Sequence, residues 1–191
     1  IVAGTVESGK LRVGDTLLFS PSNAQAKIKT LEAWPKSNQK IAEAGQAIGL
    51  TLDAPIFVER GQVASHTSDA PLLTNRFRAQ IFWLGKKPLA AGARLSLRFL
   101  YAETTVEIQS IENISRVNYG ETAAVHVRAR AQLALDDYRK NPRLGRFALM
   151  DNGAIVGGGT VDLEGAFDQR EASALGVKSK HIATMSSAIT Q

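Results

Sequence analysis

The residues best suited to chemistry lie near the start of the sequence, in the stretch GTVESGKL from Gly4 to Leu11. A phosphate-binding P-loop needs Gly, four residues, Gly, Lys and then Ser or Thr, whose hydroxyl binds Mg²⁺. Gly4, Gly9 and Lys10 fit, but Leu11 has no hydroxyl. The next residues, KLRVGDTLLFSP, predict strands and a turn, not the helix whose N-terminus would bind phosphates. We therefore interpret Ser8-Gly9 as a hairpin turn in which Gly takes a positive φ.

Two adjacent carboxylates and three histidines are the next candidates for catalysis or metal binding. Asp136 and Asp137 follow an expected strand, so local hydrogen bonds in a loop account for them. His66, His126 and His181 lack the spacing of metal ligands, and the chain has no cysteine. His126 is expected on the wet face of its strand. We predict no catalytic, cofactor-binding or metal-binding residue in this chain.

A glycine triplet, Gly157-Gly158-Gly159, invites comparison with dinucleotide-binding motifs. It lacks the required spacing and the helix that should follow. Close approach of backbones within a strand is the better interpretation. No Gly-x-Ser-x-Gly stretch is present, so a hydrolase triad has no local support either.

A basic cluster is the remaining candidate for binding. Arg139, Lys140, Arg143 and Arg146 lie in an expected loop that contains Pro142. The net charge of the chain is +5, and residues 76–165 carry thirteen basic and nine acidic residues. Such a loop suits a phosphate or an acidic partner, and a simple solvated loop fits equally well.

The elements that must position these residues are strands. In AVHVRARAQLAL the apolar residues alternate with His126, Arg128, Arg130 and Gln132, which is typical of a strand with one wet face. QAIGLTL and RLSLRFLY repeat the pattern, with turn signals between the runs. The expected inward-facing residues are Ile48, Leu50, Leu52, Leu95, Leu97, Phe99, Tyr101, Val125, Val127, Ala129, Ala131, Leu133 and Leu135. Many short strands predict an all-β fold of sandwiches or barrels.

The polar, turn-rich stretch SDAPLLTNR predicts a boundary between two β-domains, residues 1–72 and 73–165, and residues 166–191 are expected to be a linker or tail. No apolar run is long enough for a membrane span, and no signal peptide is recognisable. The lack of cysteine fits a cytoplasmic protein. Because the sequence begins on the strand-like IVAGTV without Met, we expect a fragment of a longer protein.

Two groups of phrases carry a family resemblance. AGTVESGKLRVGDTLLFSP, AGQAIGLTL and ERGQVAS resemble the second domain of the translation-factor GTPases, such as elongation factor Tu, while LALDD and GRFALMDNGAIVGGGTV resemble their third domain. The resemblance implies two consecutive small antiparallel β-barrels. LLFSPSNAQAKIKTLEAW, RFRAQIFWLGKKPLAAGARLSLRF and LALDDYRKNPRLGRFALMD are similar to the large GTPase subunit of bacterial sulfate adenylyltransferase. VKSKHIATMSSAIT resembles the joint to a fused adenylylsulfate kinase.

The resemblance implies a non-catalytic part of a sulfate-activating enzyme. GTP, ATP and Mg²⁺ would bind elsewhere in the parent, which forms adenylylsulfate from ATP and sulfate. The expected partners are the small catalytic subunit, a preceding GTPase domain and a following kinase domain, with neither nucleic acid nor membrane. Two alternatives are an RNA- or ribosome-binding module and a self-contained enzyme using the near P-loop. A strand precedes IVAGTV in the family, so we expect an open seam near Ile1 to Val6.

Overall fold

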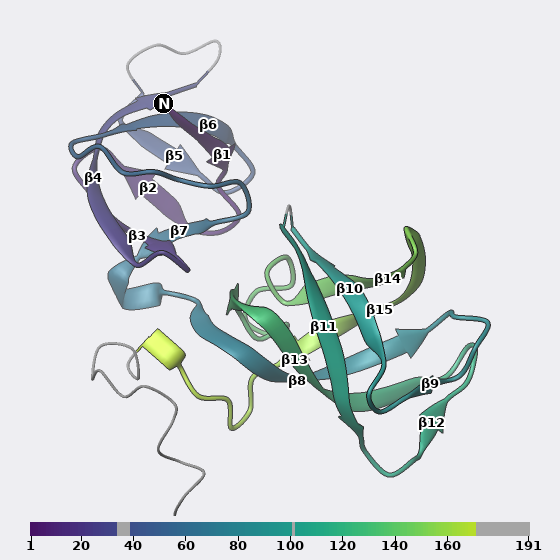
Figure 1. Cartoon of the computed structure of the whole chain (residues 1–191). Helices are drawn as coiled ribbons and strands as arrows, with labels where there is room; N and C mark the ends of the chain where they lie inside the picture. Colours follow the sequence, from purple (N-terminus) through teal and green to yellow (C-terminus); the bar gives the residue numbers. More distant parts are fainter. Residues whose placement is uncertain (34–38, 101, 171–191) are drawn as a thin grey trace, which may run out of the picture.

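The regular structure of the chain is almost entirely β-strand. The computed structural model describes residues 1–33, 39–100 and 102–170 (Figure 1). Within these residues, strands β1–β7 pair only with one another, and so do strands β8–β15. The chain therefore forms two β-units, joined through the 3₁₀ helix η1 (Thr67–Asp69). In the described part of the chain, no helix has the length and apolarity to cross a membrane.

The first unit is built around a five-stranded antiparallel sheet in the order β1-β6-β4-β3-β7, beside a smaller β2-β5 sheet. Alternation along β4 buries Ala26, Ile28 and Leu31 and leaves the lysines between them in water. Ile48 and Leu50 are buried as predicted. The strands are β1 (Val2–Thr5), β2 (Lys10–Arg12), β3 (Thr16–Ser20), β4 (Ala24–Glu32), β5 (Ile41–Glu43), β6 (Ala47–Leu52) and β7 (Val63–His66).

The main sheet of this unit is open. Strand β1 pairs only with β6, and β7 pairs only with β3, so each has one edge without a strand partner in the described residues. The sheet curls enough for β1 and β7 to line the same groove. The expected seam near Ile1 to Val6 is therefore present, and the first of the two predicted barrels is a rolled sheet with a gap.

The opening stretch differs in one respect from the prediction. Gly9 has a φ of +70°, as a turn glycine should. However, β1 pairs with β6 and β2 pairs with β5, so the predicted hairpin at Ser8-Gly9 is wrong. The residues between the two strands instead lie opposite the β5–β6 turn, where Val6 N–H donates to Gln46 O (2.9 Å) and Ala44 N–H donates to Gly9 O (3.0 Å). Strands β5 and β6, which lie more than thirty residues later in the sequence, therefore pair with β2 and β1 in place of the predicted local hairpin.

The second unit is a closed antiparallel barrel in the order β10-β11-β13-β8-β15-β14 (Figure 1). A short β12-β9 pair extends from one end. Closure removes free strand edges, which is the main difference between this unit and the first. The strands are β8 (Leu72–Trp83), β9 (Leu89–Ala90), β10 (Arg94–Phe99), β11 (Ala102–Ile111), β12 (Arg116–Val117), β13 (Thr122–Leu135), β14 (Arg146–Asp151) and β15 (Ala154–Asp162).

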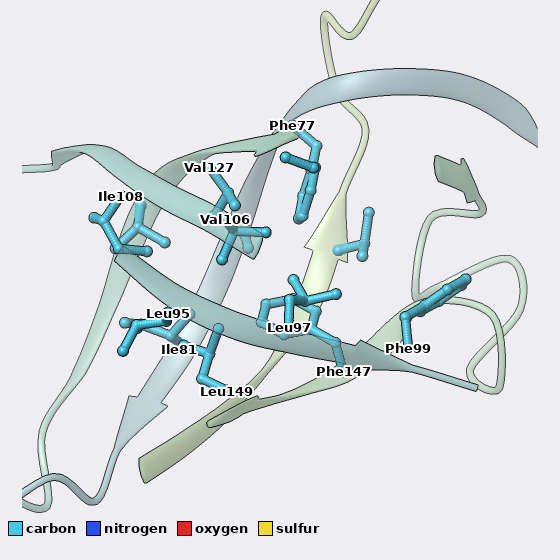
Figure 2. Close-up of a cluster of buried hydrophobic side chains, with 14 of the residues drawn as sticks. Phe77, Ile81, Leu95, Leu97, Phe99, Val106, Ile108, Val127, Phe147 and Leu149 are labelled. Atoms are coloured by element: carbon cyan, nitrogen blue, oxygen red, sulfur yellow. The ribbon is translucent and has the colours of Figure 1, made fainter. Parts of the chain in front are cut away.

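The interior of the barrel is filled by apolar side chains from every strand of its wall. Figure 2 shows Leu95, Leu97 and Phe99 of β10 pointing into this core, as the alternation predicted. Phe77 and Phe147 meet edge to face, with ring centroids 6.1 Å apart. Burying each such side chain contributes about 1.5–3 kcal/mol. Tyr101, also expected inside, lies outside the described residues.

Strand β13 follows its predicted alternation only in part. Val125, Val127 and Ala129 are buried, but Ala131 is exposed. The register to β8 shifts between Arg128 and Leu133, which is a bulge. An extra residue at a bulge reverses which side chains face inward. The expectation for Ala131 is therefore wrong.

The last described residues return to the junction of the two units. Arg170 donates to Ser20 Oγ (3.0 Å), to Asn23 Oδ1 (2.9 Å) and to the backbone oxygen of Pro71 (3.1 Å). Gln169 donates to Asn75 Oδ1 at 2.7 Å. The start of the predicted tail thus contacts both units, while residues 171–191 lie outside the described part.

Candidate functional site

The near P-loop is part of a sheet. Lys10 belongs to β2, where its Nζ lies 2.9 Å from Glu43 Oε1 on the neighbouring strand. Leu11 is partly buried and packs against the core of the first unit. A phosphate cradle needs backbone N–H groups that converge at a helix N-terminus, whereas here the next element is another strand, β3. Lys10 therefore has a cross-strand carboxylate partner, and the backbone around it does not have the geometry of a phosphate-binding loop.

The glycine triplet lies at a crowded crossing inside the barrel. A Cβ on Gly159 would come within 2.6 Å of Gln80 O and 2.7 Å of the Phe147 ring. A Cβ on Gly157 would meet Phe82 O at 2.8 Å. Close backbone approach is therefore confirmed as the reason for these glycines.

The two adjacent aspartates make local hydrogen bonds, as predicted. Asp136 is buried and accepts from Asn141 Nδ2 (3.1 Å), and burial raises the pKa of its carboxyl. Asp137 accepts from Arg139 through both side chain and backbone, and also from the N–H of Leu163. The hydrogen bond from Arg139 is the main cause that holds the pKa of Asp137 well below its usual range. Within residues 1–33, 39–100 and 102–170, no group of three or more potential ligands could hold a metal ion.

The two described histidines belong to different units and different ion pairs. His66 Nε2 lies 3.0 Å from Asp15 Oδ2, and this hydrogen bond lowers the pKa of the Asp15 carboxyl. His126 is exposed, as predicted, and its Nε2 lies 3.2 Å from Glu112 Oε1. His181 lies outside the described residues. The structure therefore does not bring the two described histidines together.

The predicted basic cluster lies in an ordered loop, residues 136–146, which we call the basic loop. Its turn is closed by hydrogen bonds from Asn141 N–H to Asp137 O (2.9 Å) and from Gly145 N–H to Asn141 O (2.8 Å). A Cβ on Gly145 would lie 2.4 Å from Tyr138 Cα, so the two arms of the loop touch. Leu144 is buried and joins the barrel core. The loop is therefore held in one shape by its own backbone.

Three of the four cations of the basic loop have carboxylate partners. Arg139 binds Asp137 within the loop. Lys140 Nζ lies 2.7 Å from Asp69 Oδ1, which raises the pKa of the lysine, and Arg143 reaches Glu7 Oε2 at 2.8 Å. Glu7 belongs to the first unit and Asp69 to the joining helix η1, so Arg143 connects the barrel to the first unit and Lys140 connects it to η1. Arg146, at the start of β14, is exposed.

A groove of about 870 Å³ lies between the open seam of the first unit and the basic loop. On one side the groove reaches the apolar core of the first unit, and on the other side it is lined by the buried carboxylate of Asp136 and by Asn141. Its lining includes Phe19, Ile48, Leu50, Asp136, Asn141 and Leu144.

Sequence reasoning missed the residues that join the two units. Arg170 was assigned to a tail, although three hydrogen bonds tie it to the first unit and the linker. Gly61 was noted only within a motif, yet a Cβ there would lie 2.9 Å from Ala102 Cβ of the barrel. A late glycine and a lone arginine carry no signal of a partner so far away in the chain.

Comparison with known proteins supports the fold of both units. Residues 76–162 match the family model described as GTP-eEF1A C-terminal domain-like. Two crystal structures of Sup35, complexed with GMPPNP and with GDP, cover 83% of this chain and 42% of their own chains, with TM-scores of 0.77 and 0.75 and 18% and 19% sequence identity. At these identities the likeness shows the fold, and the predicted all-β, elongation-factor-like fold class is confirmed.

Curated relatives extend the comparison along the chain. Sulfate adenylyltransferase subunit 1 of Alteromonas mediterranea is 28% identical over 84% of this chain and 37% of its own length. Elongation factor 1-alpha of Thermofilum pendens is 28% identical over 84% of this chain and 41% of its own. The chain thus spans less than half the length of these relatives. The barrel of this chain matches the GTP-eEF1A C-terminal domain-like model, in a sequence that is similar along most of its length to sulfate adenylyltransferase subunit 1.

Proposed function

We propose that this chain is the β-domain part of a sulfate-activating enzyme and corresponds to a segment of sulfate adenylyltransferase subunit 1. The observation that carries the proposal is the 28% identity that extends over 84% of the chain and both β-units. Parallel support comes from the fold, which is shared with translation-factor GTPases. The parent would act in the cytoplasm and form adenylylsulfate from ATP and sulfate, with GTP and Mg²⁺ bound outside these residues.

The proposed role of the two units is mechanical. The ion pairs of Lys140 and Arg143 and the hydrogen bonds of Arg170 favour one orientation of the first unit relative to the barrel. A fixed pair of β-units can hold a GTPase domain in position, dock a small catalytic subunit and transmit the nucleotide state between them. Such coupling requires contacts that differ between two states of the whole molecule. Fusion to adenylylsulfate kinase after residue 191 belongs to the same proposal.

The test uses the complete protein that contains this chain. It is expressed with and without a sulfate adenylyltransferase small subunit, and formation of adenylylsulfate from ATP and sulfate is measured with and without GTP. We expect activity only with both subunits, stimulated by GTP. The 191-residue chain alone should bind no GTP in calorimetry. Activity without the small subunit, or GTP binding by the 191-residue chain that Lys10→Ala abolishes, would refute the proposal.

An RNA- or ribosome-binding module is the second candidate. It is favoured by the similarity to elongation factor 1-alpha, which covers the same share of the chain. This function predicts binding to tRNA or ribosomal RNA that weakens steeply with salt. Tight RNA binding by the complete protein, together with no adenylyl transfer, would select it over the first candidate.

A further inference from the structure

A row of arginines crosses the outer face of the barrel. Arg94 of β10 lies opposite Glu107 of β11, Glu107 lies opposite Arg128 of β13, and Arg128 lies opposite Arg76 of β8. Neighbouring strands are about 4.8 Å apart, so the row spans roughly 14 Å. Arg130 follows on the same wet face of β13. We call these four arginines and Glu107 the arginine face.

The arginine face is not neutralised within the described residues. Its only ion pair joins Arg94 Nε to Glu107 Oε2 at 3.4 Å. Arg76, Arg128 and Arg130 are exposed and have no carboxylate partner in the described part of the chain. Like charges directly opposite each other on a sheet are unfavourable. The position of Arg128 directly opposite Arg76 therefore lowers the stability of the barrel, and no carboxylate among the described residues offsets this repulsion.

Two other arginines on the same strands have carboxylate partners. Arg78, two residues along β8, binds both Glu112 and Asp162. Arg98, on β10, binds Glu103. The cations of the basic loop are also mostly paired. On strands β8, β10 and β13, the arginines without a carboxylate partner among the described residues therefore all lie on the arginine face.

The same face contains a shallow hollow of about 390 Å³. Arginines surround it, and a guanidinium can donate two parallel hydrogen bonds to one carboxylate. Among the described residues no aromatic side chain lines the hollow, so these residues offer no platform on which a nucleic-acid base would stack. Its lining is Asn75, Arg94, Thr105, Val106, Glu107, Arg128, Ala129 and Arg130.

We propose that the arginine face docks an acidic, extended segment of a partner protein. Aspartate and glutamate side chains of that segment would supply the carboxylates that Arg76, Arg128 and Arg130 lack. The inference goes beyond the proposed function, because it concerns a recognition face of the barrel and does not depend on the parent enzyme.

The experiment measures binding of fluorescein-labelled deca-glutamate to the 191-residue chain by fluorescence anisotropy at low and moderate salt. Arg76→Glu and Arg128→Glu should each weaken binding by about tenfold or more, and raising the salt should weaken binding to the unaltered chain. The matched control is Arg116→Glu on β12, an exposed arginine with the same change of charge outside the arginine face. It should change affinity by less than about twofold.

Three outcomes would overturn the proposal. The first is no binding of deca-glutamate at low salt. The second is an equal loss for Arg116→Glu, which would indicate attraction to net charge alone. The third is tighter binding of a ten-nucleotide RNA of similar charge. Circular dichroism checks the fold of each variant, and Arg76→Gln and Arg128→Gln replace any variant that fails to fold.

Discussion

At the scale of single residues, Gly159 shows most directly how the sequence serves the fold. It lies where β15 passes both the backbone of Gln80 and the ring of Phe147. Gly159→Ala should lower the free energy of unfolding by about 1–3 kcal/mol, because the added methyl group overfills a packed site. Gly4→Ala is the matched control, since nothing lies within 4 Å of a Cβ there. Urea unfolding measures both, and equal effects would contradict the explanation.

Asp137 predicts a pH dependence. Hydrogen bonds from Arg139 lower the pKa of the folded-state carboxyl below its ordinary value of 3.8. A lowered pKa contributes stability above the ordinary pKa, and that contribution is lost as the pH falls through the folded-state pKa. Asp137→Asn should therefore be less stable than the unaltered chain at neutral pH, with a difference that shrinks below about pH 4.

The measurement is urea unfolding at several pH values, each variant compared at the same pH. Asp151→Asn serves as the control, because among the described residues its exposed carboxyl accepts a hydrogen bond only from its neighbour Asn152. A stability difference for Asp137→Asn that stays constant, or grows, as the pH falls would show that the ionic contact with Arg139 contributes nothing.

At the scale of elements, the basic loop acts first as a connection between the units. Arg143 and Glu7 form an ion pair across the junction at 2.8 Å. In a double-mutant cycle, Arg143→Ala and Glu7→Ala should show a small but measurable coupling of about 0.2–1 kcal/mol, because both groups are partly in water. Arg146→Ala with Glu7→Ala should be additive. Coupling in the control cycle, or none in the first, would contradict the assignment.

The strands could be predicted because burial leaves a pattern in the sequence. Leu95, Leu97 and Phe99 alternate with polar residues, and all three lie in the barrel core. Ala131 was assigned wrongly because a bulge leaves no mark in the alternation. The hairpin at Gly9 was also wrong, since strand pairing there depends on residues about thirty-five positions later.

The candidate site was less predictable than the fold. The sequence located the basic loop between two strands, but it gave no sign that Lys140 and Arg143 would meet Asp69 and Glu7, which are 71 and 136 residues away. Ion pairs at the surface contribute little to stability and impose no periodic pattern. Docking of a partner by the basic loop stays a prediction, now with fewer free charges to support it.

At the scale of the whole molecule, the open seam predicts association. Strands β1 and β7 each present one unpaired edge, and such edges pair readily with another chain. The 191-residue chain should self-associate weakly, as light scattering over a range of concentrations would show. Thr5→Lys places a charge on the β1 edge and should reduce the association. Thr122→Lys, on the closed barrel, is the control.

A strict monomer at high concentration would contradict this prediction. So would equal effects of the two lysine substitutions, because the second lies on a strand of the closed barrel. The closed barrel should be the same in monomer and assembly, which hydrogen exchange can check strand by strand.

The return of Arg170 to the junction also determines where mechanical tension would enter the molecule. Its guanidinium donates hydrogen bonds to Ser20, Asn23 and the backbone of Pro71, close to the linker between the two units. A force from a domain attached beyond this residue would therefore act first on the linker between the two units and only afterwards on the strands of the barrel. Arg170 would then be the attachment point through which such a domain exerts force on the two units and changes their separation.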